Sequence, residues 1–151
     1  MLAQKICEGQ DEDARLILSD IFYTRGAEAA ETNDKPTALE NNTAFLRLRL
    51  QISKTSLVGT KDATLAQAYN QAANAHLDQR MFDTALDYYG KALEVFESLP
   101  DYSETITSIC VANLATAYWL LGRLDEAHQL LLQNLRAREG EYGVDDTESF
   151  R

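Results

Sequence analysis

Two stretches of this chain repeat the same pattern of apolar and small residues. The stretch AHLDQRMFDTALDYY at Ala75–Tyr89 matches AYWLLGRLDEAHQLL at Ala117–Leu131. Ala85 and Ala127 hold the same place in the two stretches, so one repeat step is 127 − 85 = 42. Self-similarity at a fixed period of about 20–50 residues is typical of arrays, in which each repeat buries its apolar face against the next. The chain is therefore expected to be an array of small units.

Each unit has the pattern of two antiparallel helices. Apolar residues recur at intervals of three and four between Asp83 and Glu97, which places them on one stripe of a helix, and the segment from Leu65 to His76 repeats this spacing. The break at Arg80-Met81 is too short for anything except a tight turn. The two helices are therefore expected to return antiparallel and to bury their stripes together.

The same arrangement occurs twice more. Gly122-Arg123 forms the next expected turn, with Gly122 just beyond a helix end, where a left-handed conformation is cheap. The stripe expected to be buried after this turn consists of Leu124, Ala127, Leu131 and Leu135. An earlier turn is expected at Asn33-Asp34, and Ala38 precedes Ala85 by a slightly longer step, 85 − 38 = 47.

The expected hairpins span residues 12–52, 62–98 and 103–139 of a single domain covering 1–151. Met1–Glu8 has the pattern of the last turns of an earlier helix, and Asp145–Thr147 that of a cap for a further one. About seven helices are expected in a piece of a longer array. Strand alternation is absent over any useful length, so the predicted fold class is all-α.

Capping residues set the expected helix starts. Asp34 is a candidate N-cap, with Pro36 in the first turn after it. Thr60 or Asp62 is expected to cap the next helix. For the third hairpin, Asp101 and Glu104 have the spacing of a capping box, and Ser103 is the alternative cap.

These residues resemble the tetratricopeptide repeat, a helix–turn–helix unit with a period of about 34 residues. The residues that carry the resemblance in the second hairpin are Tyr69, Ala73, His76, Phe82, Ala85, Tyr89 and Ala92. Those in the third are Leu114, Ala115, Tyr118, Gly122, Leu124, Ala127 and Leu131. The resemblance implies a right-handed superhelical stack of hairpins, and the longer step between Ala85 and Ala127 is similar to the variant found in kinesin light chains and in fungal regulatory proteins. Phe45 and Asn134 depart from the small residue expected late in the second helix.

Charge and composition exclude several classes of function. The formal net charge is −10, which disfavours nucleic acid and anionic membranes and favours basic or neutral partners. No apolar run approaches the ~20 residues of a membrane span, and Cys7 and Cys110 fit reduced thiols in the cytoplasm or nucleus. The two histidines, His76 and His128, have no ligand or nucleophile pattern around them, so no enzyme, cofactor or metal site is expected.

The resemblance implies that the first helices of the hairpins line a concave face that receives peptides. The positions expected on that face are Asp20, Tyr23, Ala27, Glu31, Asn70, Asn74, Leu77, Asp78, Ala112, Thr116, Trp119 and Leu120, with Asn113 beside them. Carboxamides both donate and accept hydrogen bonds, so Asn70, Asn74 and Asn113 could hold a peptide backbone, or could contact only water. The single tryptophan, Trp119, is either a peptide contact or the cover of a joint between repeats.

The predicted function is that of a scaffold for protein–protein interaction, which binds a peptide or protein on its concave face. The alternative is a structural or self-association segment of a larger fungal-type signalling protein. A homodimer is possible, because Trp119, Leu120 and Leu132 are expected near an uncovered apolar edge.

Overall fold

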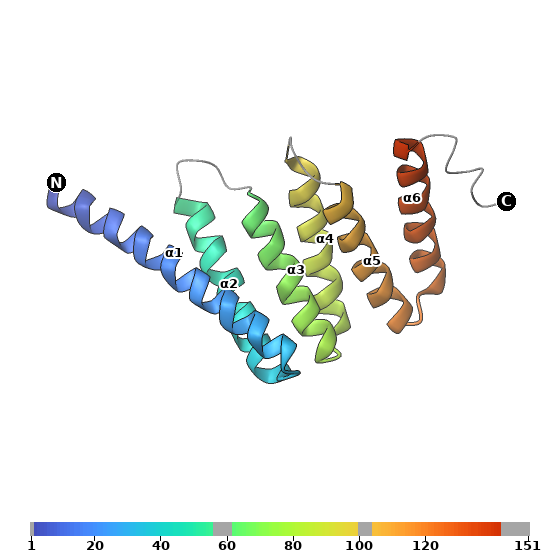
Figure 1. The fold of residues 1–151 in the computed structure, drawn as a ribbon, viewed down its shortest axis with the longest axis horizontal. Helices are drawn as coiled ribbons and strands as arrows, with labels where there is room; N and C mark the ends of the chain where they lie inside the picture. Colours follow the sequence, from blue (N-terminus) through green and yellow to red (C-terminus); the bar gives the residue numbers. More distant parts are fainter. Residues whose placement is uncertain (1, 56–61, 100–103, 143–151) are drawn as a thin grey trace.

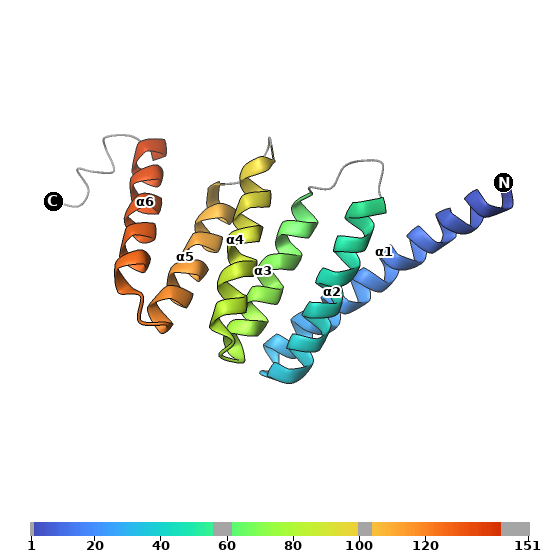
Figure 2. The same ribbon diagram turned by 180° about the vertical axis from the view of Figure 1, so that it is seen from behind.

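The computed structural model describes residues 2–55, 62–99 and 104–142, and these ranges contain six α-helices and no strand. The helices are α1 (Leu2–Glu31), α2 (Lys35–Thr55), α3 (Ala63–Asp78), α4 (Phe82–Ser98), α5 (Glu104–Leu120) and α6 (Leu124–Tyr142). They form three consecutive hairpins in an elongated stack, with α1 at one end and α6 at the other (Figures 1 and 2). Each helix packs on its neighbours in the chain, and α3 also contacts α5. The predicted fold class, an all-α stack of helical hairpins, is confirmed.

Three turns with the same backbone conformation close the hairpins. Asn33, Arg80 and Gly122 have positive φ angles of 59°, 61° and 79°. The amide after each of them donates a hydrogen bond of 2.8 Å to the carbonyl oxygen five residues earlier, in the pairs Asp34–Ala29, Met81–His76 and Arg123–Tyr118. This pattern is a Schellman motif, which satisfies carbonyl groups that the end of a helix leaves free. The three turn residues are separated by the same two steps as Ala38, Ala85 and Ala127, so the sequence repeat is also the repeat of the turns.

Two of the expected caps are present. The carboxylate of Asp62 accepts a hydrogen bond of 2.7 Å from the amide of Leu65, which makes Asp62 the N-cap of α3. Asp34 accepts a longer one of 3.3 Å from the amide of Thr37 at the start of α2. The alternatives Asp101 and Ser103 lie outside the described residues.

The first helix differs from the prediction. Residues 2–31 form one helix of 30 residues, so the separate earlier helix expected at Met1–Glu8 is wrong, and the first hairpin begins at residue 2 instead of residue 12. No proline interrupts this segment, and Gly9 costs a helix interior only about 1 kcal/mol relative to alanine. A long helix tolerates that cost. The helix expected to follow Asp145–Thr147 lies outside the described residues.

Small side chains bring the helices together. Ala73, Ala85 and Ala92 are fully buried beside Tyr89, and α5 packs over them with Cys110 and other apolar residues. Helix axes approach closely only where the side chains between them are short. The alanines that carry the sequence repeat therefore mark the crossings between helices.

The two departures from the repeat pattern are accommodated in different ways. Phe45 is buried and packs edge-to-face on Tyr23, with ring centroids 5.4 Å apart. Asn134 accepts a hydrogen bond of 3.0 Å from the hydroxyl of Ser108, which joins α6 to α5. Between α1 and α2, Gly26 lies so close to Asn42 that a methyl group on its α-carbon would overlap the Asn42 side chain.

Candidate functional site

A groove of about 500 Å³ runs between α5 and α6. Its lining is apolar except for one hydroxyl, one imidazole and the N–H group of an indole. The lining residues are Ala112, Ala115, Thr116 and Trp119 from α5, and Leu124, Ala127, His128 and Leu131 from α6. None of these side chains carries a carboxylate, an ammonium or a guanidinium group. The groove therefore suits an apolar surface.

The large side chains of this face are exposed. Trp119, Leu124, Leu131 and Leu135 have between 47 and 62% of their surface open to solvent. The three leucines follow one another at spacings of seven and four residues, which places them on a single face of α6. The sequence pattern had assigned Leu124, Leu131 and Leu135 to the buried stripe of the hairpin, and the structure corrects this assignment. Ala127, between them in the chain, is buried as expected.

The preceding hairpin shows what covers such a face. One repeat step before Leu131 stands Tyr89, which is 0% exposed and lies in the core between α3, α4 and α5. The thiol of Cys110 on α5 donates a hydrogen bond to the Tyr89 carbonyl oxygen, with the sulfur 3.6 Å from the oxygen. The groove between α5 and α6 is thus the open counterpart of the surface on which α5 packs. The corresponding surface of the preceding hairpin is covered by one helix, α5.

Two predicted site residues, Thr116 and Trp119, line this groove. The hydroxyl of Thr116 donates a hydrogen bond of 2.9 Å to the carbonyl oxygen of Ala112 on its own helix. At the adjacent turn, the guanidinium of Arg123 is bonded to Glu126 and lies 4.7 Å from the centre of the Tyr118 ring. These contacts hold the cation at the turn, outside the lining.

The predicted asparagines do not share one environment. Asn74 accepts a hydrogen bond from the hydroxyl of Tyr89, a fully buried residue, so its oxygen serves the packing of α3 on α4. The side-chain oxygen of Asn70 is buried and has no hydrogen-bond partner in the structure. Asn113 is half-buried on α5. Their common use in holding a peptide backbone stays a prediction.

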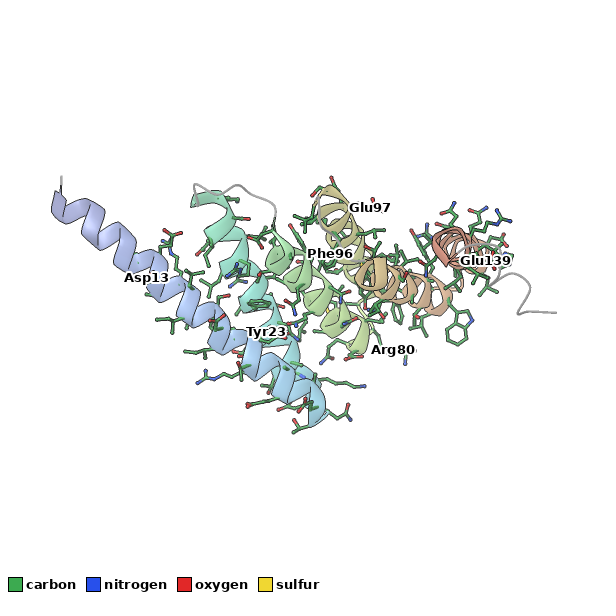
Figure 3. All side chains as sticks on the ribbon, turned by 45° about the horizontal axis from the view of Figure 1, so that its top comes forward. Asp13, Tyr23, Arg80, Phe96, Glu97 and Glu139 are labelled. Carbon is green, nitrogen blue, oxygen red and sulfur yellow. The ribbon has the colours of Figure 1, made fainter. Side chains whose placement is uncertain are left out.

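The other predicted residues lie along α1 and α3. Tyr23, labelled in Figure 3, packs on Phe45 of α2, and its hydroxyl accepts a weak hydrogen bond of 3.4 Å from Gln67 of α3. Glu31 and Asp78 are both exposed and both end their helices two residues before a left-handed turn residue. The remaining residues expected on this face include Asp20, Ala112 and Leu120, which are exposed, and Ala27 and Leu77, which are half-buried.

The titratable side chains of the core, Cys110, Tyr89 and His76, are buried among packed helices. Burial raises the pKa of the Cys110 thiol to about 11, and burial also raises the pKa of Tyr89. His76 is buried, with Nδ1 2.7 Å from the carbonyl oxygen of Ala72 and its ring edge-to-face with Tyr88. Across the described ranges, no three side chains of His, Cys, Asp or Glu are grouped so as to bind a metal ion. In the same ranges, no helix has the length and hydropathy of a membrane span.

Comparison with known families agrees with this architecture. A family model described as tetratricopeptide repeat matches residues 64–145, which is more than half of the chain. The chain belongs to the tetratricopeptide repeat family. No curated protein matches it. The tetratricopeptide fold is a non-catalytic repeat scaffold that generally mediates protein–protein interactions.

Proposed function

We propose that this tetratricopeptide repeat chain is a protein-interaction module, not an enzyme, and that it binds the apolar face of a partner segment in the groove between α5 and α6. The observation that supports this proposal is the exposure of Leu131 at the position where the preceding hairpin has the fully buried Tyr89. The surface at the same repeat position in the preceding hairpin is covered by a helix, α5. An amphipathic helix is therefore the partner structure that fits it best.

The exposed side chains are large enough to contribute measurable affinity. Full burial of a leucine or a larger side chain contributes about 1.5–3 kcal/mol, so covering the half-exposed Leu124, Leu131 and Leu135 contributes roughly 1 kcal/mol each. Trp119 adds the aromatic anchor that is common at the centre of interfaces. Lost translational and rotational freedom offsets much of this sum. Binding is expected to be moderate and reversible.

The partner is expected to be basic or neutral. The lining of the groove is uncharged, but the whole chain has a net charge of −10, with Glu31 and Asp78 exposed at the ends of α1 and α3. A basic segment could extend from the groove along α3 and α1, the concave face that the sequence analysis expected. Its affinity should fall as salt rises above roughly 0.15 M, where the screening length is about 8 Å. The same charge disfavours nucleic acid and anionic membranes. A cytoplasmic or nuclear location stays a prediction from Cys7 and Cys110.

The experiment compares capture of partners by three forms of the protein. The wild type, Leu131→Glu and Met81→Glu are immobilised, and the bound proteins are identified by mass spectrometry. Met81→Glu is the matched control, since Met81 is an exposed apolar residue in the α3–α4 turn, outside the groove. Partners that bind the groove are retained by the wild type and by Met81→Glu and are lost with Leu131→Glu.

A direct readout follows from the single tryptophan. Because Trp119 lines the groove, a synthetic peptide from a captured partner should shift its fluorescence to shorter wavelength as the groove is filled. Equal capture by all three forms, or peptide binding without a change in Trp119 emission, would contradict the proposed site.

A further inference from the structure

Exposed large apolar side chains gather at the two ends of the described structure. Ile17, Leu18 and Ile21 lie on α1 and are 40–62% exposed. At the other end are Ile109, Trp119, Leu120, Leu124, Leu131 and Leu135 of α5 and α6. Met81, in the turn between α3 and α4, is the one large hydrophobic residue exposed between these ends within the described ranges. The two faces lie at opposite ends of the stack (Figure 1).

The repeat register shows what the face on α1 corresponds to. In the repeat register, Leu18 and Ile21 of the first hairpin correspond to Leu65 and Ala68 of the second. Leu65 and Ala68 pack on α2 in a cluster that includes Phe45. The step from the second hairpin to the third leads from Ala68 to Cys110, which lies in the core against Tyr89. In α3 and α5 this register position thus packs the first helix of a hairpin against the hairpin before it. In α1 the same position is open.

The geometry points to a second copy of this chain as the occupant of the groove: we propose that Leu18 and Ile21 of one copy pack on Leu131 and Leu135 of the next. This inference rests on the proposed binding function of the groove and adds a copy of this chain as an occupant, beside the basic or neutral partner. The contact would continue the interface that already joins α4 to α5 inside the molecule. A chain cannot make this contact with itself, because its two faces are at opposite ends.

Charged residues limit the area of the proposed contact between copies, and the net charge of the chain makes it dependent on salt. Arg25 and Glu28 are exposed at the register positions where α5 has Leu114 and Ala117, so the apolar contact is confined to the part of α1 around Leu18 and Ile21. Each copy has a net charge of −10, and the copies repel one another. Salt screens this repulsion, so self-association should strengthen as salt rises. Binding of a basic partner should change in the opposite direction.

The interface joins two different surfaces, and such head-to-tail contacts build rings or open chains. Two variants block one surface each: Ile21→Glu blocks the face on α1, and Leu131→Glu blocks the groove. Each variant keeps one intact surface, so its association with itself should be weakened, whereas an equimolar mixture of the two can form one intact interface. The mixture should therefore stop at a dimer that contains one copy of each.

The measurement is analytical ultracentrifugation over a concentration series, with circular dichroism to verify that each variant is folded. The wild type and Met81→Glu should associate, each blocked variant should associate more weakly by roughly tenfold or more, and the mixture should recover a dimer. A wild type that stays monomeric at high concentration and high salt overturns the inference. So does an oligomer that Leu131→Glu abolishes and Ile21→Glu preserves, because that result indicates a symmetric contact between two grooves.

The same variants separate this inference from the proposed function. Ile21→Glu leaves the groove intact, so it should still bind a partner peptide and shift the Trp119 emission. Peptide binding by a wild type that never self-associates would overturn only the second copy as occupant. Self-association without any captured partner would instead contradict binding of another protein.

Discussion

Replacing a glycine by alanine is expected to change the stability of this protein in opposite directions at two positions. Gly122 has a φ of 79° in the turn between α5 and α6, whereas Gly90 lies inside α4. A methyl group on either residue would meet no atom within 4 Å, so steric overlap contributes to neither change. The backbone conformation alone therefore decides the sign of the effect.

The magnitudes follow from the two conformations. Alanine in the left-handed region costs roughly 1–2 kcal/mol, and the reduced freedom of the unfolded chain returns about 0.4–1 kcal/mol, so Gly122→Ala should destabilise the protein by about 1 kcal/mol. Gly90→Ala should stabilise it by up to about 1 kcal/mol, because alanine is the better residue in an exposed helix interior. The two variants should therefore differ by roughly 2 kcal/mol, or several degrees in Tm.

Urea unfolding followed by circular dichroism measures both changes under the same conditions. The m-value should stay that of the wild type, since neither change alters the surface buried on folding. Shifts of the same sign in the two variants, or a Gly122→Ala variant as stable as the wild type, would refute the argument from backbone conformation.

Two further predictions test the core around α4 and the groove between α5 and α6. Ala85→Leu should lower the free energy of unfolding by about 1–3 kcal/mol, because Ala85 is fully buried beneath α5. Ala127→Leu should lower it clearly less, because Ala127 lines the open groove. Equal losses of Tm in the two variants would contradict the open groove. Burial raises the pKa of Cys110 from 9.0 to about 11, so the thiol of the unfolded chain loses its proton at a lower pH than the thiol of the folded chain. The stability that this shift contributes is therefore full below about pH 9 and is lost as the pH rises towards 11. Urea unfolding from pH 7 to 10.5 should show a smaller fall in the free energy of unfolding for Cys110→Ala than for the wild type, by at most about 1.4 kcal/mol per pH unit. The fall due to Tyr89, whose pKa is also raised by burial, should remain in the variant.

The sequence predicted the hairpins well because their determinants are local and periodic. The repeated alanines Ala38, Ala85 and Ala127 mark the helix crossings, and Gly122 marks a left-handed turn by its residue type. Arg80 adopts the same left-handed conformation although its residue type does not predict it, because the two packed helices on either side require a turn there. The length of α1 was missed for a related reason, since a single glycine weakens a helix without ending it.

The candidate site was harder to predict, since periodicity identifies a stripe but not what covers it. Tyr89 and Leu131 have the same register, yet α5 covers the first, and nothing in the described residues covers the second. Residue spacing likewise did not reveal that Asn74 accepts a hydrogen bond from Tyr89 on another helix. Such contacts depend on the angle between the helices, which the spacing of residues does not define.

The contacts along the stack also determine how the molecule can come apart. Among the described residues, α1 and α2 make no contact with α5 and α6. Beyond neighbours in the chain, α3 also contacts α5, and Gln67 of α3 bonds to Tyr23 of α1. The contacts between helices thus join mainly helices that are adjacent in the chain, which favours rapid folding. Folding can start in any hairpin and spread to the next. Opening the α5–α6 hairpin exposes only the surface it shares with α3 and α4, so its amides should exchange with solvent sooner than those of α3, which is held from both sides.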